Sequence, residues 1–178
     1  MVLRPLIRQD LAALIAHSIR VTQESGKGGN PIFAPYDLDS PWNKTEAEKS
    51  IARAWATPIN ESGWRKDWGV FLEEKMLGNL DLRGSSLFTG NHRAHLGIGI
   101  ELEAQNQGFG KKLLQISLDW ARAQTTLEWI DLFVFSNNVR AIKMYEAFGF
   151  QRVGYVADKF RVNGLSIDDM TMTLKLRD

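Results

Sequence analysis

A glycine-rich turn between a strand-like run and a helix-like run is the feature that most constrains the fold. The run before it ends at Leu102, and apolar residues recur at helical spacing after it. The turn reads Gln105-Asn106-Gln107-Gly108-Phe109-Gly110-Lys111. Glycine lets the backbone approach an anion closely, and the start of a helix carries partial positive charge. The turn therefore predicts a phosphate-binding connection, although a plain strand-to-helix connection that merely uses glycine would look the same.

Two other phosphate motifs fit this turn poorly. A dinucleotide fingerprint needs a third small residue where the chain has Leu113. A P-loop needs Ser or Thr after its lysine, where the chain has Lys112. The spacing therefore disfavours a nucleotide-binding α/β module.

A second pattern follows one strand later and reads Asn138-x-x-Ala141-x-x-x-Tyr145-x-x-x-Gly149-Phe150. On a helix, Ala141 and Tyr145 share a face, and Gly149 stands where a left-handed C-terminal residue belongs. Tyr145 could be an ordinary core aromatic. Its hydroxyl, with an unperturbed pKa of about 10, could also give a proton to a leaving group. Asn138 could likewise be a simple helix N-cap or a ligand to a substrate.

The remaining periodicity predicts a mixed α/β sheet. Strand-like runs occupy residues 2–6, 68–73, 75–83, 92–101, 129–135, 150–156 and 170–176, and helix-like runs follow residue 10, span 45–55, follow residue 108 and span 138–147. Asp10 is expected near the N-cap of the first helix, and Thr45 with Glu48 resembles a capping box for the second. The order predicts a mostly antiparallel sheet with helices on both faces and a central parallel pair between residues 95–102 and 129–135.

One face of the run at 92–101 is apolar and the other is unusually small. The small face carries His95, Gly97, Gly99 and Glu101. Glycines inside a strand often mean that another backbone or a ligand lies close. Because His92 and His95 point to opposite faces of a strand, they make a poor metal pair, and we expect no metal.

Composition narrows the function classes. The 178 residues suit one domain, and 44% hydrophobic with 24% charged residues is typical of a globular chain. A net charge of +1 without a long basic run gives no nucleic-acid footprint, and no apolar stretch approaches the ~20 residues of a membrane span. The absence of cysteine weakly favours the cytoplasm and excludes an acyl-cysteine intermediate.

Together, the two patterns resemble the GNAT superfamily of N-acetyltransferases over about residues 92–154. The resemblance implies one domain over residues 1–178, with the acceptor side in 1–90, the acetyl-CoA-binding core in 91–157 and a C-terminal strand region in 158–178. Members commonly carry a proline near the position of Leu102, and this chain does not. That departure loosens the placement of the strand end.

The resemblance also implies the roles of individual residues, with acetyl-CoA as cosubstrate. The turn would bind the pyrophosphate, the strand ending at Leu102 would pair with the pantetheine arm, and N–H groups around Ile98 to Ile100 would polarise the thioester carbonyl. Tyr145 would be the general acid for the CoA thiolate, and Asn138 a ligand to the pantetheine or to the catalytic geometry. The cofactor-binding residues expected in this way are Ile98, Ile100, Gln105, Asn106, Gln107, Gly108, Phe109, Gly110, Lys111, Asn138 and Tyr145.

Without cysteine, direct attack of an amine on the thioester is the natural mechanism. A base is then needed, because an α-amine has a pKa of about 8 and a lysine one of about 10.4. Glu101 is the first candidate and Asp131 the second, although either could be an ordinary polar group. Glu73, Glu74 and Asp81 are weaker candidates. The expected catalytic residues are Tyr145, Asn138 and Glu101.

The acceptor is expected to be a primary amine of an amino acid, a small molecule or a peptide. The irregular loop at 25–43, with Phe33, Tyr36 and Trp42, could shape its pocket or simply pack. Residues 160–164 and 168–169 resemble a turn of bacterial members that act on amino acids or peptide N-termini. The alternative function is a CoA-binding regulatory or interaction domain without transfer activity, and a homodimer is a family-level expectation.

Overall fold

A seven-stranded sheet in the order β1-β2-β3-β4-β5-β7-β6 organises the molecule. The structure is a computed structural model that describes residues 1–37 and 43–177. Its strands are β1 Val2–Pro5, β2 Arg65–Leu72, β3 Lys75–Gly84, β4 Arg93–Ile100, β5 Trp129–Phe135, β6 Gln151–Val162 and β7 Leu165–Lys175, and its helices are α1 Leu11–Gln23, α2 Lys44–Ala56, α3 Phe109–Ala123 and α4 Val139–Ala147. Every strand pair is antiparallel except β4 with β5. The predicted fold class is confirmed.

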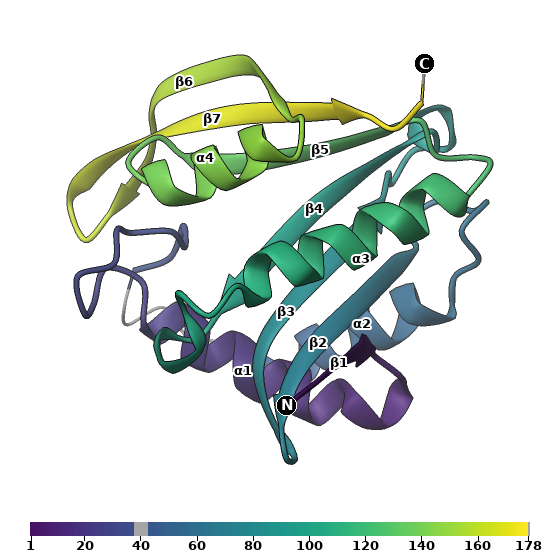
Figure 1. Ribbon diagram of the computed structural model, residues 1–178, viewed down its shortest axis with the longest axis horizontal. Helices are drawn as coiled ribbons and strands as arrows, with labels where there is room; N and C mark the ends of the chain where they lie inside the picture. The colour runs from purple at the N-terminus through teal and green to yellow at the C-terminus, as the bar shows by residue number, and fades with distance from the viewer. Residues whose placement is uncertain (38–42, 178) are drawn as a thin grey trace.

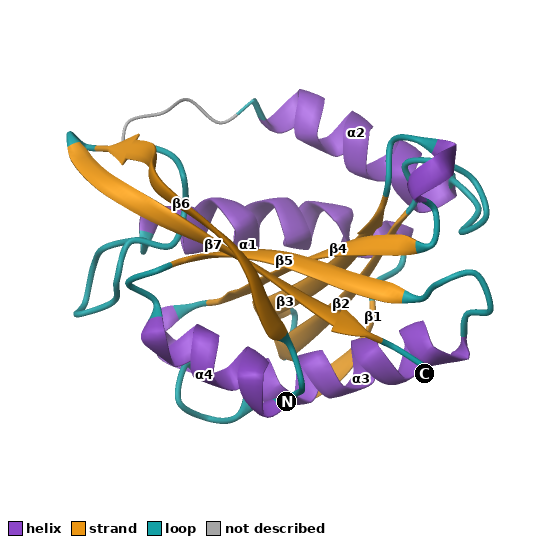
Figure 2. Ribbon diagram, turned by 90° about the horizontal axis from the view of Figure 1, so that it is seen from above, coloured by secondary structure: helices purple, strands orange, loops and turns teal. Residues whose placement is uncertain are grey.

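The helices form two outer layers. In Figure 2, α1 and α2 lie on one face of the sheet, and α3 and α4 lie on the other. Trp120 of α3 packs between two buried tryptophans, with ring centroids 5.9 Å from Trp64 and 5.4 Å from Trp68. Each such buried ring contributes about 2 kcal/mol through apolar burial, so this cluster fixes α3 against β2 and the residue that precedes it. None of the described helices is long and apolar enough to cross a membrane.

The parallel contact between β4 and β5 is short. It pairs Arg93 with Trp129, Ala94 with Ile130 and His95 with Asp131. Beyond His95, β4 stays with β3 and β5 stays with β7, so the two strands diverge toward their carboxyl ends (Figure 1). The opening lies outside the carboxyl ends of two adjacent parallel strands, the position at which open α/β sheets bind ligands.

One of the two expected helix caps is wrong. Helix α2 begins earlier than Thr45, because Asn43 is its N-cap and accepts a hydrogen bond from Glu46 N at 3.1 Å. Asp10 is the N-cap residue of α1 as expected, although its carboxylate makes no capping bond to that helix. It accepts from Ile7 N at 2.9 Å and pairs with Arg4 at 2.6 Å.

Three expected strand ends are also wrong. β4 ends at Ile100, and a 3-10 turn at Leu102–Ala104 follows it. The last two strands form one long hairpin that turns at Asn163 and Gly164, with φ of 49° and 77°. These backbone angles suit the Asn-Gly pair of a tight hairpin turn. β6 is an exposed edge strand, so its outer half lacks the apolar signal that would have shown its length.

Candidate functional site

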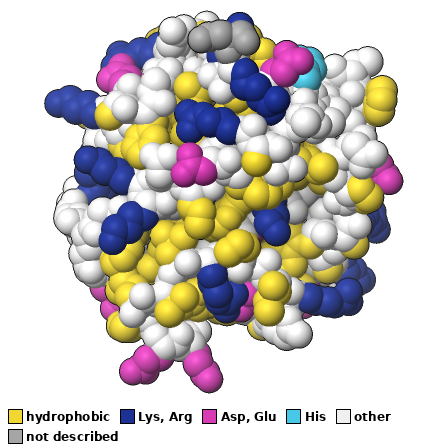
Figure 3. Space-filling model, turned by 45° about the vertical axis from the view of Figure 1, so that its right-hand side comes forward, with side chains coloured by type: hydrophobic (Ala, Val, Ile, Leu, Met, Phe, Trp, Pro, Cys, Tyr) yellow, Lys and Arg dark blue, Asp and Glu magenta, His cyan; other side chains and the backbone are white. Residues whose placement is uncertain are grey.

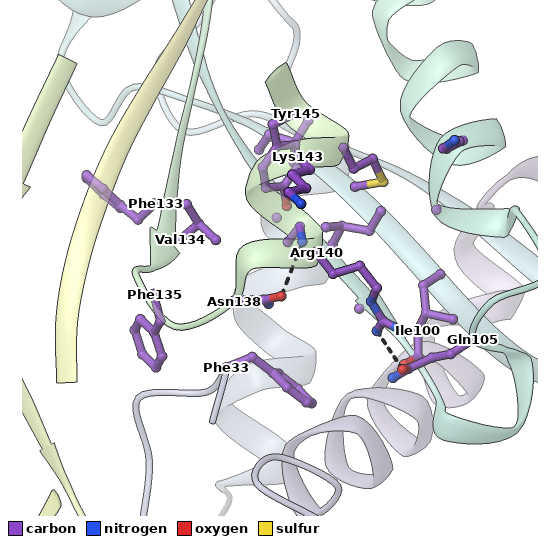
Figure 4. A pocket seen from close by; sticks show the side chains of 18 of the residues that line it. Phe33, Ile100, Gln105, Phe133, Val134, Phe135, Asn138, Arg140, Lys143 and Tyr145 are labelled. Atoms are coloured by element: carbon purple, nitrogen blue, oxygen red, sulfur yellow. Dashed lines mark hydrogen bonds between the residues drawn. The ribbon is translucent and has the colours of Figure 1, made fainter. Parts of the chain in front are cut away.

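A cavity of about 870 Å³ occupies the opening between β4 and β5. One end, the donor end, is lined by the carboxyl end of β4, by residues of the 104–111 segment and by α4. The other, the acceptor end, is lined by His95 of β4, by β3, β5 and the β6–β7 hairpin, and by Phe33, Pro35 and Tyr36. Figure 4 shows α4 between β5 and the loop that carries Gln105. The expected cofactor-binding residues that line it are Ile98, Ile100, Gln105, Asn106, Gly108, Phe109, Gly110, Lys111, Asn138 and Tyr145. Gln107 does not line it, and its side chain bonds to Glu103 O at 2.8 Å.

The donor-end turn is built to hold an anion. Asn106 and Gly108 have positive φ of 60° and 80°, and this conformation turns successive N–H groups toward one side. Lys112 N donates to Gly108 O at 3.2 Å, so the three N–H groups before it, at residues 109–111, lie in the unbonded first turn of α3. These amides and the helix dipole can bind a pyrophosphate without a metal.

Arg140 ties α4 to this turn. Its Nη2 donates to Gln105 Oε1 at 2.6 Å, and its Nη1 donates to Asn106 Oδ1 at 2.9 Å. Gln105 Nε2 donates in turn to Ile100 O at 3.1 Å, which fixes the turn to the end of β4. With Lys111 and Lys143, Arg140 gives the donor end three basic side chains. Both motifs of the sequence therefore meet through one guanidinium (Figure 4).

The free edge of β4 faces the cavity. Glu101 N donates to Leu77 O at 2.9 Å, so odd-numbered residues of β4 bond to β3. Because bonding alternates along a strand, the N–H groups of Ile98 and Ile100 point to the other edge, where β5 has diverged. These groups can pair with an extended ligand arm or polarise a carbonyl.

Tyr145 and Asn138 serve both the core and the cavity. Tyr145 is 5% exposed and packs 5.7 Å from Phe150, yet it lines the cavity. Burial raises the pKa of its hydroxyl above the ordinary value, so the group is protonated at neutral pH. Asn138 caps α4 through a hydrogen bond from Ala141 N at 3.3 Å and also lines the cavity.

Glu101 lies outside the lining, beneath β4. It is 2% exposed, and its Oε1 contacts His17 Nδ1 at 2.7 Å and Arg20 Nε at 2.9 Å. Burial opposes ionisation, but the hydrogen bonds from Arg20 and His17 outweigh it and hold the pKa of Glu101 below its ordinary value. Asp131 is similar, because Arg93 and Thr173 bind its carboxylate at 2.6 Å and 2.7 Å. The structure therefore brings neither of the first two base candidates to the cavity.

The acceptor end instead contains His95 and two ion pairs. Burial, followed by the charge of Arg83, lowers the pKa of His95 to about 4, so its ring is neutral at pH 7. Arg83 Nε lies 2.8 Å from Asp81 Oδ2, and Lys159 Nζ lies 2.6 Å from Asp169 Oδ2. Among residues 1–37 and 43–177, no three His, Asp or Glu side chains are grouped as metal ligands would be. Trp42 of the expected aromatic loop lies outside these ranges.

Comparison with known proteins identifies the family. The model of the acetyltransferase (GNAT) domain matches residues 1–151, which is most of the chain. The chain belongs to this GNAT family. The resemblance read from the two motifs is therefore confirmed.

Two curated GNAT relatives match shorter segments. N-alpha-acetyltransferase RimI of Mycobacterium tuberculosis is 37% identical over 67 residues, 38% of this chain and 40% of the relative. Spermidine N(1)-acetyltransferase of Vibrio cholerae is 35% identical over 74 residues, 41% of this chain and 43% of the relative. In each case the match spans less than half of the relative's length.

Solved structures share the fold over the whole chain. An acetyltransferase of the GNAT family from Streptococcus pneumoniae has a TM-score of 0.80 at 23% identity and covers 98% of both chains. The structure of yncA from Salmonella typhimurium, which was solved with its cofactor acetyl-CoA, has a TM-score of 0.80 at 16% identity and covers 100% of this chain and 95% of its own. At these identities the likeness establishes the GNAT fold.

Sequence reasoning missed several residues of this GNAT site. Arg140 stands inside the second motif, between Asn138 and Ala141, and its position in the first turn of a helix was a usable signal. Arg83 and Lys159 carried no such signal. They reach the cavity from β3 and from the β6–β7 hairpin, through strand pairings that no local pattern announces.

Proposed function

We propose that this chain is an N-acetyltransferase that moves the acetyl group of acetyl-CoA to a primary amine by direct attack in a ternary complex. One observation carries the proposal: a single cavity joins the anion-binding turn, the free edge of β4 and the hydroxyl of Tyr145. A cosubstrate with a pyrophosphate at one end and a thioester at the other fits that order. Family membership and the names of the curated relatives support the same reaction class.

The donor half is assigned from the turn inward. The pyrophosphate of CoA binds the N–H groups of residues 109–111, where Lys111, Arg140 and Lys143 add positive charge. The pantetheine arm then runs along the free edge of β4 and passes Asn138. The thioester carbonyl accepts from the N–H groups of Ile98 and Ile100, which stabilise the oxyanion as it forms.

Transfer needs one bond to form and one to break. The amine nitrogen bonds to the acetyl carbon, and the carbon–sulfur bond breaks with the electron pair leaving on sulfur. Tyr145 donates a hydrogen bond to that thiolate as general acid. Since an ordinary thiol pKa is about 8.5, below that of a phenol, this hydrogen bond stabilises the thiolate and solvent completes the protonation.

His95 is the residue that accepts a hydrogen bond from the attacking amine. Its neutral ring lines the acceptor end and can accept a hydrogen bond from the attacking amine, whose surplus proton passes to solvent. Glu101 and Asp131 are already bonded to basic neighbours outside the lining, so this proposal gives them no contact with the amine. A His95→Gln variant with unchanged kcat/KM would remove His95 from this role.

CoA binding tests the donor half directly. Gly108 has φ of +80°, and a Cβ there would meet nothing within 4 Å, so Gly108→Val acts mainly by straining the turn. Calorimetry should show CoA affinity about 10-fold lower, because left-handed backbone costs a side chain roughly 1–2 kcal/mol or forces the turn to move. Gly63→Val is the matched control, with φ of +84°, equally open space and a place outside the cavity.

The outcomes separate the two candidate functions. Release of free CoA thiol from acetyl-CoA in the presence of pooled amines supports transfer. CoA binding without thiol release from any amine would favour a CoA-binding regulatory domain. No CoA affinity in the intact protein would remove both functions.

Location and assembly complete the proposal. A cytoplasmic location is supported only by the lack of cysteine, and a homodimer only by the family resemblance. Cell fractionation tests the first, and sedimentation at several protein concentrations tests the second. The acceptor-side, donor and C-terminal divisions at residues 90 and 157 are part of the same proposal.

A further inference from the structure

Basic side chains dominate the cavity. Its described lining holds five of them and one acidic side chain, namely Arg83, Lys111, Arg140, Lys143 and Lys159 against Asp169. Three of the basic residues belong to the donor end, where CoA phosphates take up their charge. Arg83 and Lys159 belong to the acceptor end. CoA would not reach them there, so their charge faces the acceptor.

The acidic partners at the acceptor end offer almost no exposed surface to a ligand. Asp169 is 1% exposed and lies behind Lys159, which is 2.6 Å away. Asp81 is 7% exposed, is shared between Arg83 and Arg65, and is outside the lining. The described surface at this end therefore presents cations backed by buried carboxylates, which repels a polycation and attracts an anion.

Arg83 is held where such an anion would meet it. The residue pairs across the strands with His95, and its Nη2 would lie 3.3 Å from a Cβ at Gly97. The missing side chain at Gly97 therefore lets the guanidinium lie over β4, beside the group that would contact the amine. Its side chain is still 47% exposed, so donors remain available for a ligand.

An apolar wall completes the acceptor end. Phe133 is 54% exposed on β5, although its ring packs 4.8 Å from that of His95. The cavity is also lined by Phe33, Pro35, Tyr36, Phe135 and Phe160. The loop that carries the first three is fixed to the β6–β7 turn, because Asn163 N donates to Asp37 Oδ1 at 2.6 Å.

We infer that the acceptor is a free amino acid with an apolar side chain, and that Arg83 binds its carboxylate. The amine then lies at His95, the carboxylate at Arg83 and the side chain against Phe133. This inference rests on the proposed transfer reaction and narrows its acceptor. It separates this chain from the curated relative named for spermidine, because a polyamine would find no accessible carboxylate on the described lining.

The test pairs each amino acid with its decarboxylated amine. Thiol release from acetyl-CoA is measured at about pH 9 with phenylalanine, leucine and methionine, with the three corresponding amines and amino-acid amides, and with spermidine. Each kcat/KM is expressed per unprotonated amine, because an alkylamine has a pKa of about 10.4 and an α-amine a lower one. The amino acids should have kcat/KM values about 10- to 100-fold higher than the amines, as a charged hydrogen bond implies. Arg83→Gln should remove most of that ratio by raising KM for the amino acids alone.

Two further variants sharpen the result. Arg122→Gln is the control. Arg122 pairs with Asp119 at 3.5 Å on the exposed face of α3, and neither residue lines the cavity. Lys159→Gln should shift preference toward amines without a carboxylate, since it uncovers Asp169. A merely structural effect of either cavity variant would lower activity with both members of a pair equally.

Several results would overturn the inference. Equal use of acid and amine, preference for the amide or for spermidine, or an equal loss for both pair members in Arg83→Gln would each do so while leaving acetyl transfer intact. CoA binding with no thiol release in the presence of any acceptor would overturn the inference together with the proposed function. The patterns are distinct, so the acceptor and the reaction are judged separately.

Discussion

The two ends of the cavity are built from different material. The donor end uses backbone N–H groups of β4 and the turn at 105–111, with α4 close behind, all within about fifty consecutive residues. The acceptor end uses side chains from β3, β5, the β6–β7 hairpin and the loop before residue 38. A site made by backbone on neighbouring elements imposes a local sequence pattern, whereas a site assembled from distant side chains imposes none.

The charges of the two ends differ in the same way. Within residues 1–37 and 43–177, Lys111 and Lys143 form no ion pair, and Arg140 bonds only to the neutral Gln105 and Asn106. Arg83 and Lys159 are instead each paired with a carboxylate. The donor end thus offers charge to any phosphate, while the acceptor end fixes its cations in position before a ligand arrives. Fixed cations select among ligands more strongly than free ones, because their side chains lose little conformational entropy when a ligand binds.

Figure 3 shows one outer face of the molecule. Hydrophobic side chains form a band across this face, and Lys and Arg side chains lie on both sides of the band.

The largest predicted effect lies where the two ends meet. Tyr145→Phe should lower kcat about 100-fold, because a positioned acid contributes 10²–10⁴-fold and the thiolate would otherwise leave without a donor. The loss should be constant from about pH 6 to 10, since burial raises the pKa of Tyr145 beyond that range. Steady-state thiol release at saturating acetyl-CoA measures it.

Tyr155→Phe is the matched control for this prediction. Its hydroxyl bonds to Asp168 on the exposed hairpin, and the residue does not line the cavity. Equal kcat in Tyr145→Phe and the parent protein, with unchanged CoA affinity, would return Tyr145 to the role of a core aromatic. Another group would then have to donate the hydrogen bond to the CoA thiolate.

Ten of the eleven residues that the motifs led us to expect do line the cavity, whereas Arg140 and Lys143, which also line it, were not expected. Gly108, Gly110 and Tyr145 lie where the resemblance implied, because backbone conformation and helix phase are encoded locally. Glu101 could not be placed in this way. The alternation of side chains along the strand placed Glu101 correctly on the small face. The packing of α1 then determines that His17 and Arg20 cover it.

The predicted ends of β6 and β7 were wrong for a related reason. Residues 151–159 of the edge strand β6 are all exposed, so burial sets little of its pattern, and the predicted strand stopped at residue 156. Lys159 was therefore not expected at the cavity, although the hairpin brings it to the acceptor end. The acceptor side was hidden by long-range pairing rather than by unusual chemistry.

A smaller effect tests whether the donor end depends on charge or only on backbone. Arg140→Ala should weaken CoA binding about 10-fold, as expected for one charged contact, and should leave the acceptor KM unchanged. It should also flatten the dependence of CoA affinity on salt. Calorimetry at two ionic strengths measures both.

Arg152→Ala is the control for that change. Arg152 pairs with Glu146 at 2.7 Å at the far end of α4, outside the cavity. A loss of CoA affinity equal in the two variants would show that α4 stability, not the bridge to Gln105 and Asn106, is responsible. The donor end would then be a purely backbone site.

The smallest effect concerns the acceptor end and is read from stability. The pKa of His95 is about 4 in the folded chain, because burial and Arg83 disfavour the charged ring. The ordinary value of about 6.5 applies when the chain unfolds. Above pH ~6.5 the ring is neutral in both states and gives no slope. Between about 6.5 and 4 only the unfolded chain takes up the proton, so the unfolding free energy falls as pH is lowered.

The size of this decrease in unfolding free energy distinguishes a rigid, preformed acceptor end from a flexible one. We expect about 1 kcal/mol, well below the full linkage value, because His95 is only half-buried and water screens its charge. His95→Gln should remove this part of the slope in urea titrations at pH values between about 4 and 7, whereas His92→Gln, at an exposed position, should not. Parallel curves for His95→Gln and the parent would mean that the ring gains a proton without cost. Arg83 would then be too far away, or too mobile, to act on His95, and the fixed cation on which acceptor selection depends would be absent.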